Sequence, residues 1–157
     1  MIGLFMLALS LRLLYWLLLK RNYAFYDSPS DDVLYYHQWA VSIASGNNPR
    51  EVFWGMPLYP YFLALLYQLT LGNLFWIRLL HAVLGAFNCV LTFGVAEKIF
   101  GPRVATLASL LMGCNFVLIY YDGLMLPATL IITLSLVVVL NLLRWNAQSG
   151  KKEWFLL

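Results

Sequence analysis

The chain has 157 residues, of which 62% are hydrophobic and 11% are charged, and its mean hydropathy is +0.77. Soluble domains carry about a quarter charged residues, so this composition excludes an ordinary soluble domain and indicates an integral membrane protein. The net charge of +3 is not gathered into a run of lysines and arginines, so no nucleic acid is expected as a partner. Cys89 and Cys114 lie in apolar runs, where cysteine is commonly a small buried hydrophobe.

The first apolar stretch covers residues 1–19 and is closed by Lys20 and Arg21. It lacks the basic start and small-residue cleavage site of a secretory signal peptide, so we expect an uncleaved membrane span. Arg12 lies inside it, where an unpaired arginine costs about 2.5–3.5 kcal/mol on insertion scales. We therefore expect Arg12 either to face other helices or to snorkel toward the interface.

A polar, aromatic-rich loop follows over residues 20–73. Within it, Ser30 or Asp31 is a suitable cap for a helix over about 31–45, and Gly46 begins a stretch that stops this helix. The apolar residues of the segment recur at helical spacing. The helix is too short and too polar to span, so we expect it to lie along the membrane surface.

Three later stretches have the composition of membrane spans, at residues 74–100, 104–121 and 128–143, and an apolar run from Trp154 opens a further one. Before them, residues 57–71 cover only about 23 Å as a helix, short of the ~30 Å hydrocarbon core. The sequence thus predicts an all-α integral membrane protein with about four spans and juxtamembrane helices on one face. Because it ends inside an apolar run, we expect the N-terminal part of a longer multi-span domain.

Charge indicates whether residues 57–71 cross the membrane. If they do not, a set of basic residues shares one side, which the positive-inside rule makes cytoplasmic: Lys98, Arg103, Arg144, Lys151 and Lys152. If they do, the same charges all lie outside. The first arrangement is favoured, so 57–71 is expected to be re-entrant or interfacial, on the outer face with the 20–73 loop and the turn at Asp122. We expect the plasma (inner) membrane, with this face outward.

The loop also gathers residues that could carry chemistry. Asp31 and Asp32 head the expected surface helix, where a carboxylate is either a helix cap, worth about 0.5–2 kcal/mol, or a general base. Tyr35, Tyr36 and Tyr59 are either interfacial aromatics or stacking platforms for a sugar ring.

Two histidines and an arginine complete the candidates. His37 beside Asp32 lacks the further ligands of a metal site, so neither a metal nor another cofactor is expected. Arg78 and His81 lie one helical turn apart near the outer end of the 74–100 span, where a cation can hold a lipid phosphate. A lone histidine in a membrane helix is more often a hydrogen-bonded packing residue.

Several short motifs, taken in order, resemble those of one family. They are Asp32-x-x-Tyr35-Tyr36-x-x-x-Ala40, Ile43-Ala-Ser-Gly46-Asn47, Pro57-Leu-Tyr-Pro-Tyr-Phe-Leu-Ala64, Ile77-Arg78-Leu-Leu-His81, Ala96-Glu-Lys98-Ile-Phe-Gly101-x-Arg103 and Tyr121-Asp122-Gly-Leu-Met125. Together they resemble the N-terminal part of membrane glycosyltransferases of the GT-C fold. The closest branch resembles the dolichyl-phosphate-mannose protein mannosyltransferases (glycosyltransferase family 39) and bacterial relatives, including aminoarabinose transferases acting on lipid A.

The resemblance implies transfer of a sugar from a polyprenyl-phosphate donor to a protein, lipid or glycan outside the cytoplasm. It implies that Asp32, with Asp31 as the neighbouring alternative, activates the acceptor hydroxyl. It also makes 57–71 a juxtamembrane helix. Ala128 stands where many relatives carry a second acid, so either Asp122 substitutes for that acid or this subfamily does not need it. The candidates for substrate binding are Tyr35, Tyr36, His37, Tyr59, Arg78, His81 and Asp122.

The alternative hypothesis is a non-enzymatic multi-span protein, such as a transporter half or an assembly subunit. A transporter predicts polar residues or helix breaks at mid-membrane. In the predicted spans the main polar residues are Asn88 and Asn115, and no acid is expected at mid-span. This favours a site at the membrane face and hence the enzyme, although we expect the part in hand to be inactive alone.

Overall fold

The computed structural model describes residues 1–22, 31–47 and 55–149. Within these ranges the chain forms helices and no strand: α1 (Ile2–Asn22), α2 (Asp31–Ala44), α3 (Leu58–Thr70), α4 (Leu74–Phe100), α5 (Pro102–Cys114), α6 (Phe116–Gly123) and α7 (Ala128–Ser149). The prediction of an all-α fold is therefore confirmed. The expected cap Ser30 and the start of a further span at Trp154 lie outside the described residues.

Among the described residues, three helices are long and apolar enough to cross a membrane: α1, α4 and α7. Helices α5 and α6 make a fourth span if the bend of 50° between them lies within one crossing. Asn115 forms the break, because its side chain accepts hydrogen bonds from the backbone N–H groups of Val117 and Leu118, at 3.0 and 3.3 Å. An asparagine in this position caps a new helix, so the span expected over 104–121 is broken. The chain is an integral membrane protein.

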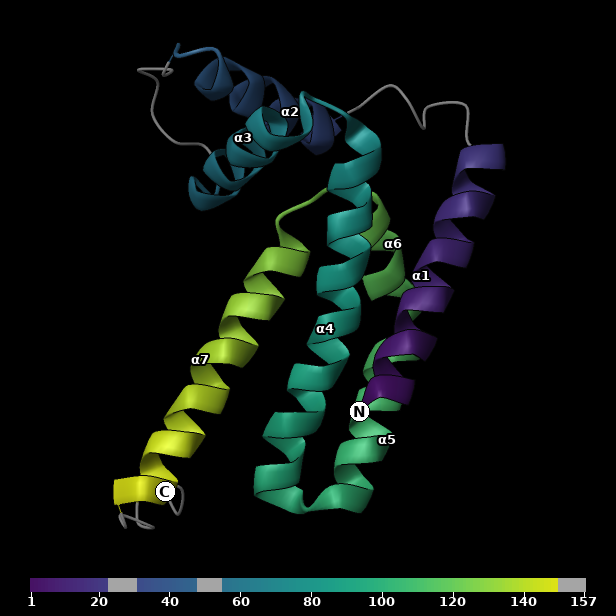
Figure 1. Cartoon of the computed structure of the whole chain (residues 1–157), viewed down its shortest axis with the longest axis vertical. Helices are drawn as coiled ribbons and strands as arrows, with labels where there is room; N and C mark the ends of the chain where they lie inside the picture. The colour runs from purple at the N-terminus through teal and green to yellow at the C-terminus, as the bar shows by residue number, and fades with distance from the viewer. Residues whose placement is uncertain (23–30, 48–54, 150–157) are drawn as a thin grey trace.

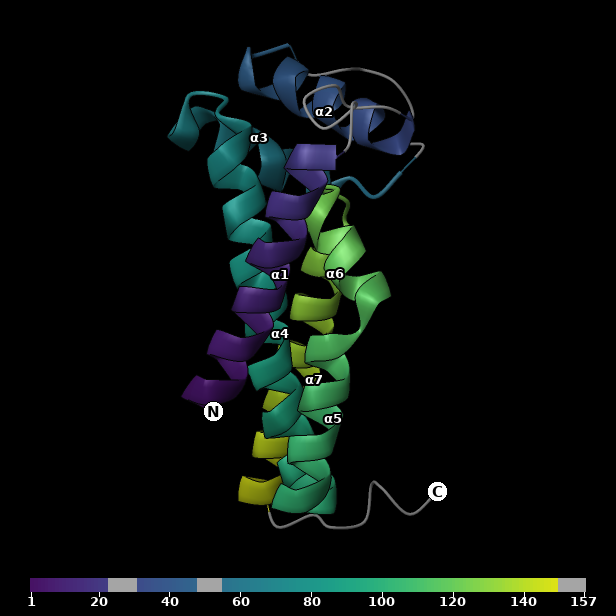
Figure 2. The same ribbon diagram turned by 90° about the vertical axis from the view of Figure 1, so that its right-hand side faces the viewer.

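Helix α4 is the centre of the bundle, with α1 and α7 on opposite sides of it and α5 and α6 behind (Figure 1). Small side chains allow this close packing, since Ala8 of α1 and Ala86 and Cys89 of α4 form one buried cluster. Figure 2 shows the same bundle from the side, with α5 and α6 following one another toward the upper end. Gly101, with φ +84, lets the chain reverse between α4 and α5.

Helices α2 and α3 pack against each other and lie across the end of the bundle at which α4 begins (Figures 1 and 2). We call this pair the hairpin and this end of the bundle the hairpin end. Helix α2 stops where Gly46 takes φ +83, and the N–H of Asn47 bonds to the carbonyl of Ser42 at 3.0 Å. As a 13-residue helix, α3 is about 20 Å long. The hairpin therefore occupies the place of the two surface helices expected over 31–45 and 57–71.

An apolar cluster joins the hairpin to the bundle. It contains one residue of α2, most of the buried side chains of α3, one residue of α4 and one of the α6–α7 turn: Ala40, Tyr59, Leu63, Ala64, Leu66, Tyr67, Ile77 and Met125. Burying a large apolar side chain stabilises a fold by about 1.5–3 kcal/mol in water. This cluster therefore attaches the hairpin to the end of the bundle by apolar burial.

A cysteine-labelling experiment tests whether α3 crosses the membrane. In the full native chain, with Cys89→Ala and Cys114→Ala, the exposed Ser45 and Gln68 are replaced singly by cysteine. Because the hairpin lies across one end, both should react with an impermeant maleimide from the same side. Lys98→Cys, near the far end of α4, is the control and should react from the opposite side. Reaction of the first two from opposite sides would show that α3 crosses.

Candidate functional site

Asp32 is the second residue of α2, and its side chain is exposed. Helix N-termini leave backbone N–H groups without intrahelical acceptors, and these groups favour a nearby negative charge. Asp31 begins the same helix, but its side chain lies outside the described residues. The structure thus presents the Asp32 carboxyl on the hairpin, open to an incoming molecule.

An aromatic row follows Asp32 along α2. The ring of Tyr35 is 41% exposed and contacts the rings of Tyr36 and Trp39, with centroids 5.3 and 5.7 Å apart. Tyr36 in turn meets Tyr59 of α3 edge to face at 5.3 Å. Tyr36 and Tyr59 therefore belong to the contact between the two helices, whereas Tyr35 still offers ring surface next to Asp32.

His37 and Tyr67 join the two helices of the hairpin through a hydrogen bond of 2.6 Å between Nδ1 and the phenol oxygen. Burial lowers the pKa of His37. Burial also raises the pKa of Tyr67 to about 12, although the nearby charge of Arg78 opposes the rise. A neutral imidazole thus meets a protonated phenol, and the phenol can donate to an unprotonated Nδ1. Among the described residues, no three His, Cys, Asp or Glu side chains form a group that could hold a metal.

Arg78 and His81 are buried on α4 beneath the hairpin, with 8% and 0% of their surface exposed. The Nε2 of His81 lies 3.3 Å from the hydroxyl of Tyr59, and its Nδ1 has no hydrogen-bond partner among the described residues. Burial raises the pKa of Tyr59 well above its usual value, so the hydroxyl stays protonated and can donate to this nitrogen. The Nε2 atom of His81 therefore joins α4 to α3, whereas its Nδ1 atom makes no hydrogen bond to the described residues.

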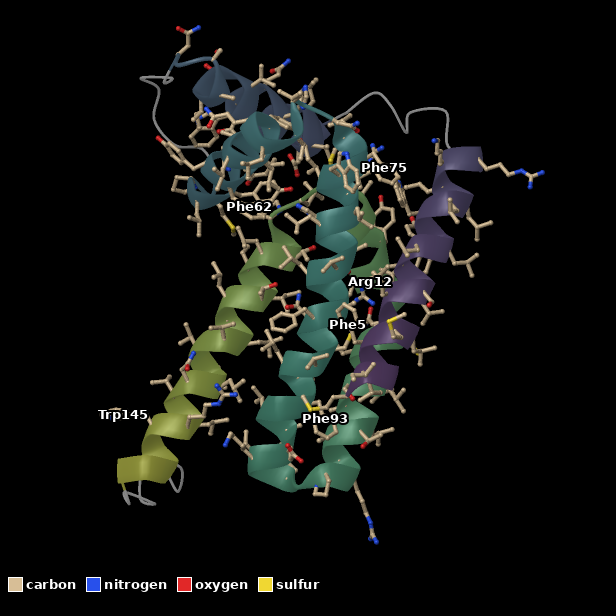
Figure 3. All side chains as sticks on the ribbon, in the orientation of Figure 1. Phe5, Arg12, Phe62, Phe75, Phe93 and Trp145 are labelled. Carbon is tan, nitrogen blue, oxygen red and sulfur yellow. The ribbon has the colours of Figure 1, made fainter. Side chains whose placement is uncertain are left out.

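Asp122 lies inside the bundle and forms an ion pair with Arg12 of α1. The Nε of Arg12 is 2.7 Å from Oδ2 of Asp122, and the hydroxyl of Thr129 donates to Oδ1 at 2.5 Å. Figure 3 shows Arg12 reaching from α1 toward α4. The pair rests against Gly85, where a Cβ atom would overlap both charged groups.

These positions give α4 a buried polar stripe at helical spacing, made of Arg78, His81, Gly85 with its ion pair, and Asn88. Gly85 is eleven residues beyond the start of α4, which places the ion pair about 16 Å from the hairpin end of that helix. The ion pair thus lies deeper in the bundle than the turn at which the sequence places Asp122. An arginine within a membrane span needs a partner. Asp122 is the acid that directly follows the expected span over 104–121, so this requirement could have predicted its pairing with Arg12.

The family model described as dolichyl-phosphate-mannose-protein mannosyltransferase matches residues 49–157. The chain belongs to this family. No curated protein and no solved structure matches the chain significantly. As a member of this family, the protein is a membrane glycosyltransferase of the mannosyltransferase type.

The match divides the candidate residues of this glycosyltransferase into two groups. Tyr59, Arg78, His81 and Asp122 lie within the matched residues, on α3, α4 and α6. The candidates of α2, Asp32 among them, lie before the match begins. In the hairpin, the ring contact of Tyr36 with Tyr59 brings a member of each group together.

Two glycine substitutions in α4 test how closely the ion pair is packed. Gly85→Ala should destabilise the protein by about 1–3 kcal/mol, as overpacking does, because the new methyl group overlaps Asp122 and Arg12. Gly94→Ala is the matched control, since its Cβ would meet only Leu140 at an ordinary 3.6 Å. Thermal unfolding in detergent, followed by size-exclusion chromatography, measures both. Equal melting temperatures for the two variants would contradict this packing.

Proposed function

We propose that the protein transfers a sugar from a polyprenyl-phosphate-linked donor to a hydroxyl of a protein, lipid or glycan at the hairpin end of the bundle. Family membership supports sugar transfer. The observation that carries the location is the arrangement of charge: a buried arginine, Arg78, lies in the first turns of a membrane span, under a hairpin whose exposed end carries Asp32. A lipid phosphate and a water-borne acceptor can both reach this boundary.

Each group has a defined task in this reaction. The carboxylate of Asp32 accepts the proton of the acceptor hydroxyl, whose oxygen then forms a bond to the anomeric carbon of the sugar. The bond between that carbon and the phosphate oxygen breaks, and the phosphate leaves with an added negative charge. The guanidinium of Arg78 stabilises this charge through charge-assisted hydrogen bonds. Tyr35 offers an exposed ring against which a sugar can stack.

The hairpin end faces outward from the plasma (inner) membrane in this proposal. Exposed Lys98, Arg103 and Arg144 lie at the opposite end of the bundle, and basic residues of short loops remain in the cytoplasm. In the sequence, three basic residues oppose this orientation, Lys20, Arg21 and Arg50, against five that favour it, Lys98, Arg103, Arg144, Lys151 and Lys152. The orientation also agrees with a lipid-borne donor, which is used where no nucleotide sugar is available.

Replacement of the proposed base tests the reaction directly. In the full native chain, Asp32→Asn should lower the rate of sugar transfer by about 10²–10⁴, as loss of a general base does, at unchanged expression. Asparagine caps a helix about as well as aspartate, so a purely structural role predicts near-normal activity. Transfer is measured with a radiolabelled polyprenyl-phosphate sugar in proteoliposomes.

Two further carboxylates serve as controls for Asp32→Asn. Glu97→Gln removes an exposed acid at the far end of α4 and should leave the rate unchanged. Asp31→Asn should be active, and an inactive Asp31→Asn beside an active Asp32→Asn would move the base by one residue. Full activity of both aspartate variants would contradict a carboxylate mechanism.

Arg78 is tested through the donor. Arg78→Met retains the bulk of the side chain and removes its charge, so the KM for the donor should rise about 10- to 100-fold, corresponding to a charged hydrogen bond of about 1.5–3 kcal/mol. Arg78→Lys should recover part of this loss, and the exposed Arg103→Met, at the opposite end, should cause none. An unchanged donor KM in Arg78→Met would leave Arg78 as a packing residue.

Two features of the bundle favour the non-enzymatic alternative, a transporter. The ion pair of Arg12 with Asp122 and the break between α5 and α6 are features that transporters place at mid-membrane. In the described residues, however, the charge of this acid is paired with Arg12, and each of its oxygens accepts a hydrogen bond, so a transported cation would compete with the arginine for the carboxylate. Sugar transfer by the purified full-length protein decides between the two functions.

A further inference from the structure

The carboxylate of Asp122 holds together the two ends of the α6–α7 turn. Asp122 is near the end of α6, and its Oδ1 accepts from Thr129 in the first turn of α7, at 2.5 Å. Its Oδ2 is bound by Arg12 of α1 at 2.7 Å. The guanidinium of Arg12 also donates to the backbone carbonyls of Ala8 and Gly113, at 3.0 and 3.4 Å. One acid thus fixes the turn to α1 and, through Arg12, to the end of α5.

The turn held in this way carries a residue that reaches the hairpin. Met125 has φ +57, a left-handed conformation that a side chain other than glycine rarely adopts, yet it is only 3% exposed. It packs in the same apolar cluster as Tyr59 and Leu63 of α3. An unfavourable backbone conformation persists only where the surroundings determine it. Here the surroundings are the Asp122 contacts below the turn and the hairpin above it.

We infer that Asp122 is a positioning residue: it holds the α6–α7 turn so that Met125 supports the α2–α3 hairpin and thereby sets the place of Asp32 above the membrane span. This inference depends on the proposed function for the role of Asp32. It gives Asp122 a task different from the substrate binding expected from its family position, since its carboxylate touches Arg12 and Thr129 and is 5% exposed.

The inference is tested by weakening the turn without leaving a charge unpaired. Asp122→Asn would strand the buried Arg12 and could prevent folding, so Thr129→Val is the better variant, because it removes only the hydroxyl that binds Oδ1. Thr133→Val is the matched control: it lies one turn further along α7, and its hydroxyl bonds only to the carbonyl of Thr129 in its own helix. Met125→Ala removes the supporting side chain and is the second variant.

The hairpin position is measured by electron paramagnetic resonance in the full native chain. Spin labels are attached at Gln38→Cys on α2 and Phe87→Cys on α4, both exposed, after replacement of Cys89 and Cys114 by alanine. Thr129→Val and Met125→Ala should each broaden the distance distribution at least two-fold, and Thr133→Val should match the parent. An unbroadened distribution in both test variants would overturn the inference.

Kinetics separate a positioning role from substrate contact. Thr129→Val and Met125→Ala, without labels, should lower kcat about ten-fold, because misplacement of a catalytic group by 1 Å costs up to about 10² in rate. The KM for the donor should stay within two-fold. A raised donor KM at unchanged kcat would place Asp122 in the donor site and overturn the inference. The distance measurement does not require catalysis, so failure of the proposed function through Asp32→Asn remains distinguishable.

Discussion

The ion pair between Arg12 and Asp122 is the interaction on which the arrangement of this bundle depends. A charge left unpaired in hydrocarbon costs several kcal/mol, so α1 and α6 are constrained to meet at one depth. They meet against α4 at Gly85, where the absence of a side chain leaves room for both groups. The hydrophobic effect cannot choose this geometry, because lipid is as apolar as the helices. The polar contacts therefore decide which helices are neighbours.

The hairpin is held by apolar burial rather than by an ion pair. Its helices have 14 and 13 residues, and they bury aromatic and aliphatic side chains against each other and against the end of the bundle. Its polar contacts join neutral groups, His37 with Tyr67 and Tyr59 with His81, which need no counter-charge. The bundle thus contains a buried ion pair, whereas apolar burial joins the hairpin to the bundle. Met125 lies in the α6–α7 turn of the bundle and packs in the apolar cluster that holds the hairpin.

The sequence predicts the helices better than their contacts. Composition and span length predict the all-α fold, and α4 runs over the expected residues 74–100. Gly46 marks the end of α2, because glycine adopts the positive φ of this position at little cost. The break at Asn115 escapes a single-sequence reading, since one asparagine in an apolar run is compatible with a continuous helix. The partner of Arg12 and the left-handed conformation of Met125 depend on helices far apart in the chain, about which local periodicity carries no information.

The family match covers one of the two groups that the proposed reaction assigns to donor and acceptor. The matched residues include Arg78, which would hold the donor phosphate, while Asp32 on α2 lies before them. Every enzyme that uses a polyprenyl-phosphate sugar meets the same leaving group, so the donor side imposes one chemical requirement. Acceptors differ in size and polarity, and in the proposed reaction they reach the sugar at the hairpin. The proposal thus places the general base on the hairpin, supported from below by the α6–α7 turn, and the donor phosphate in the bundle, so that the two substrates meet at the boundary between hairpin and bundle.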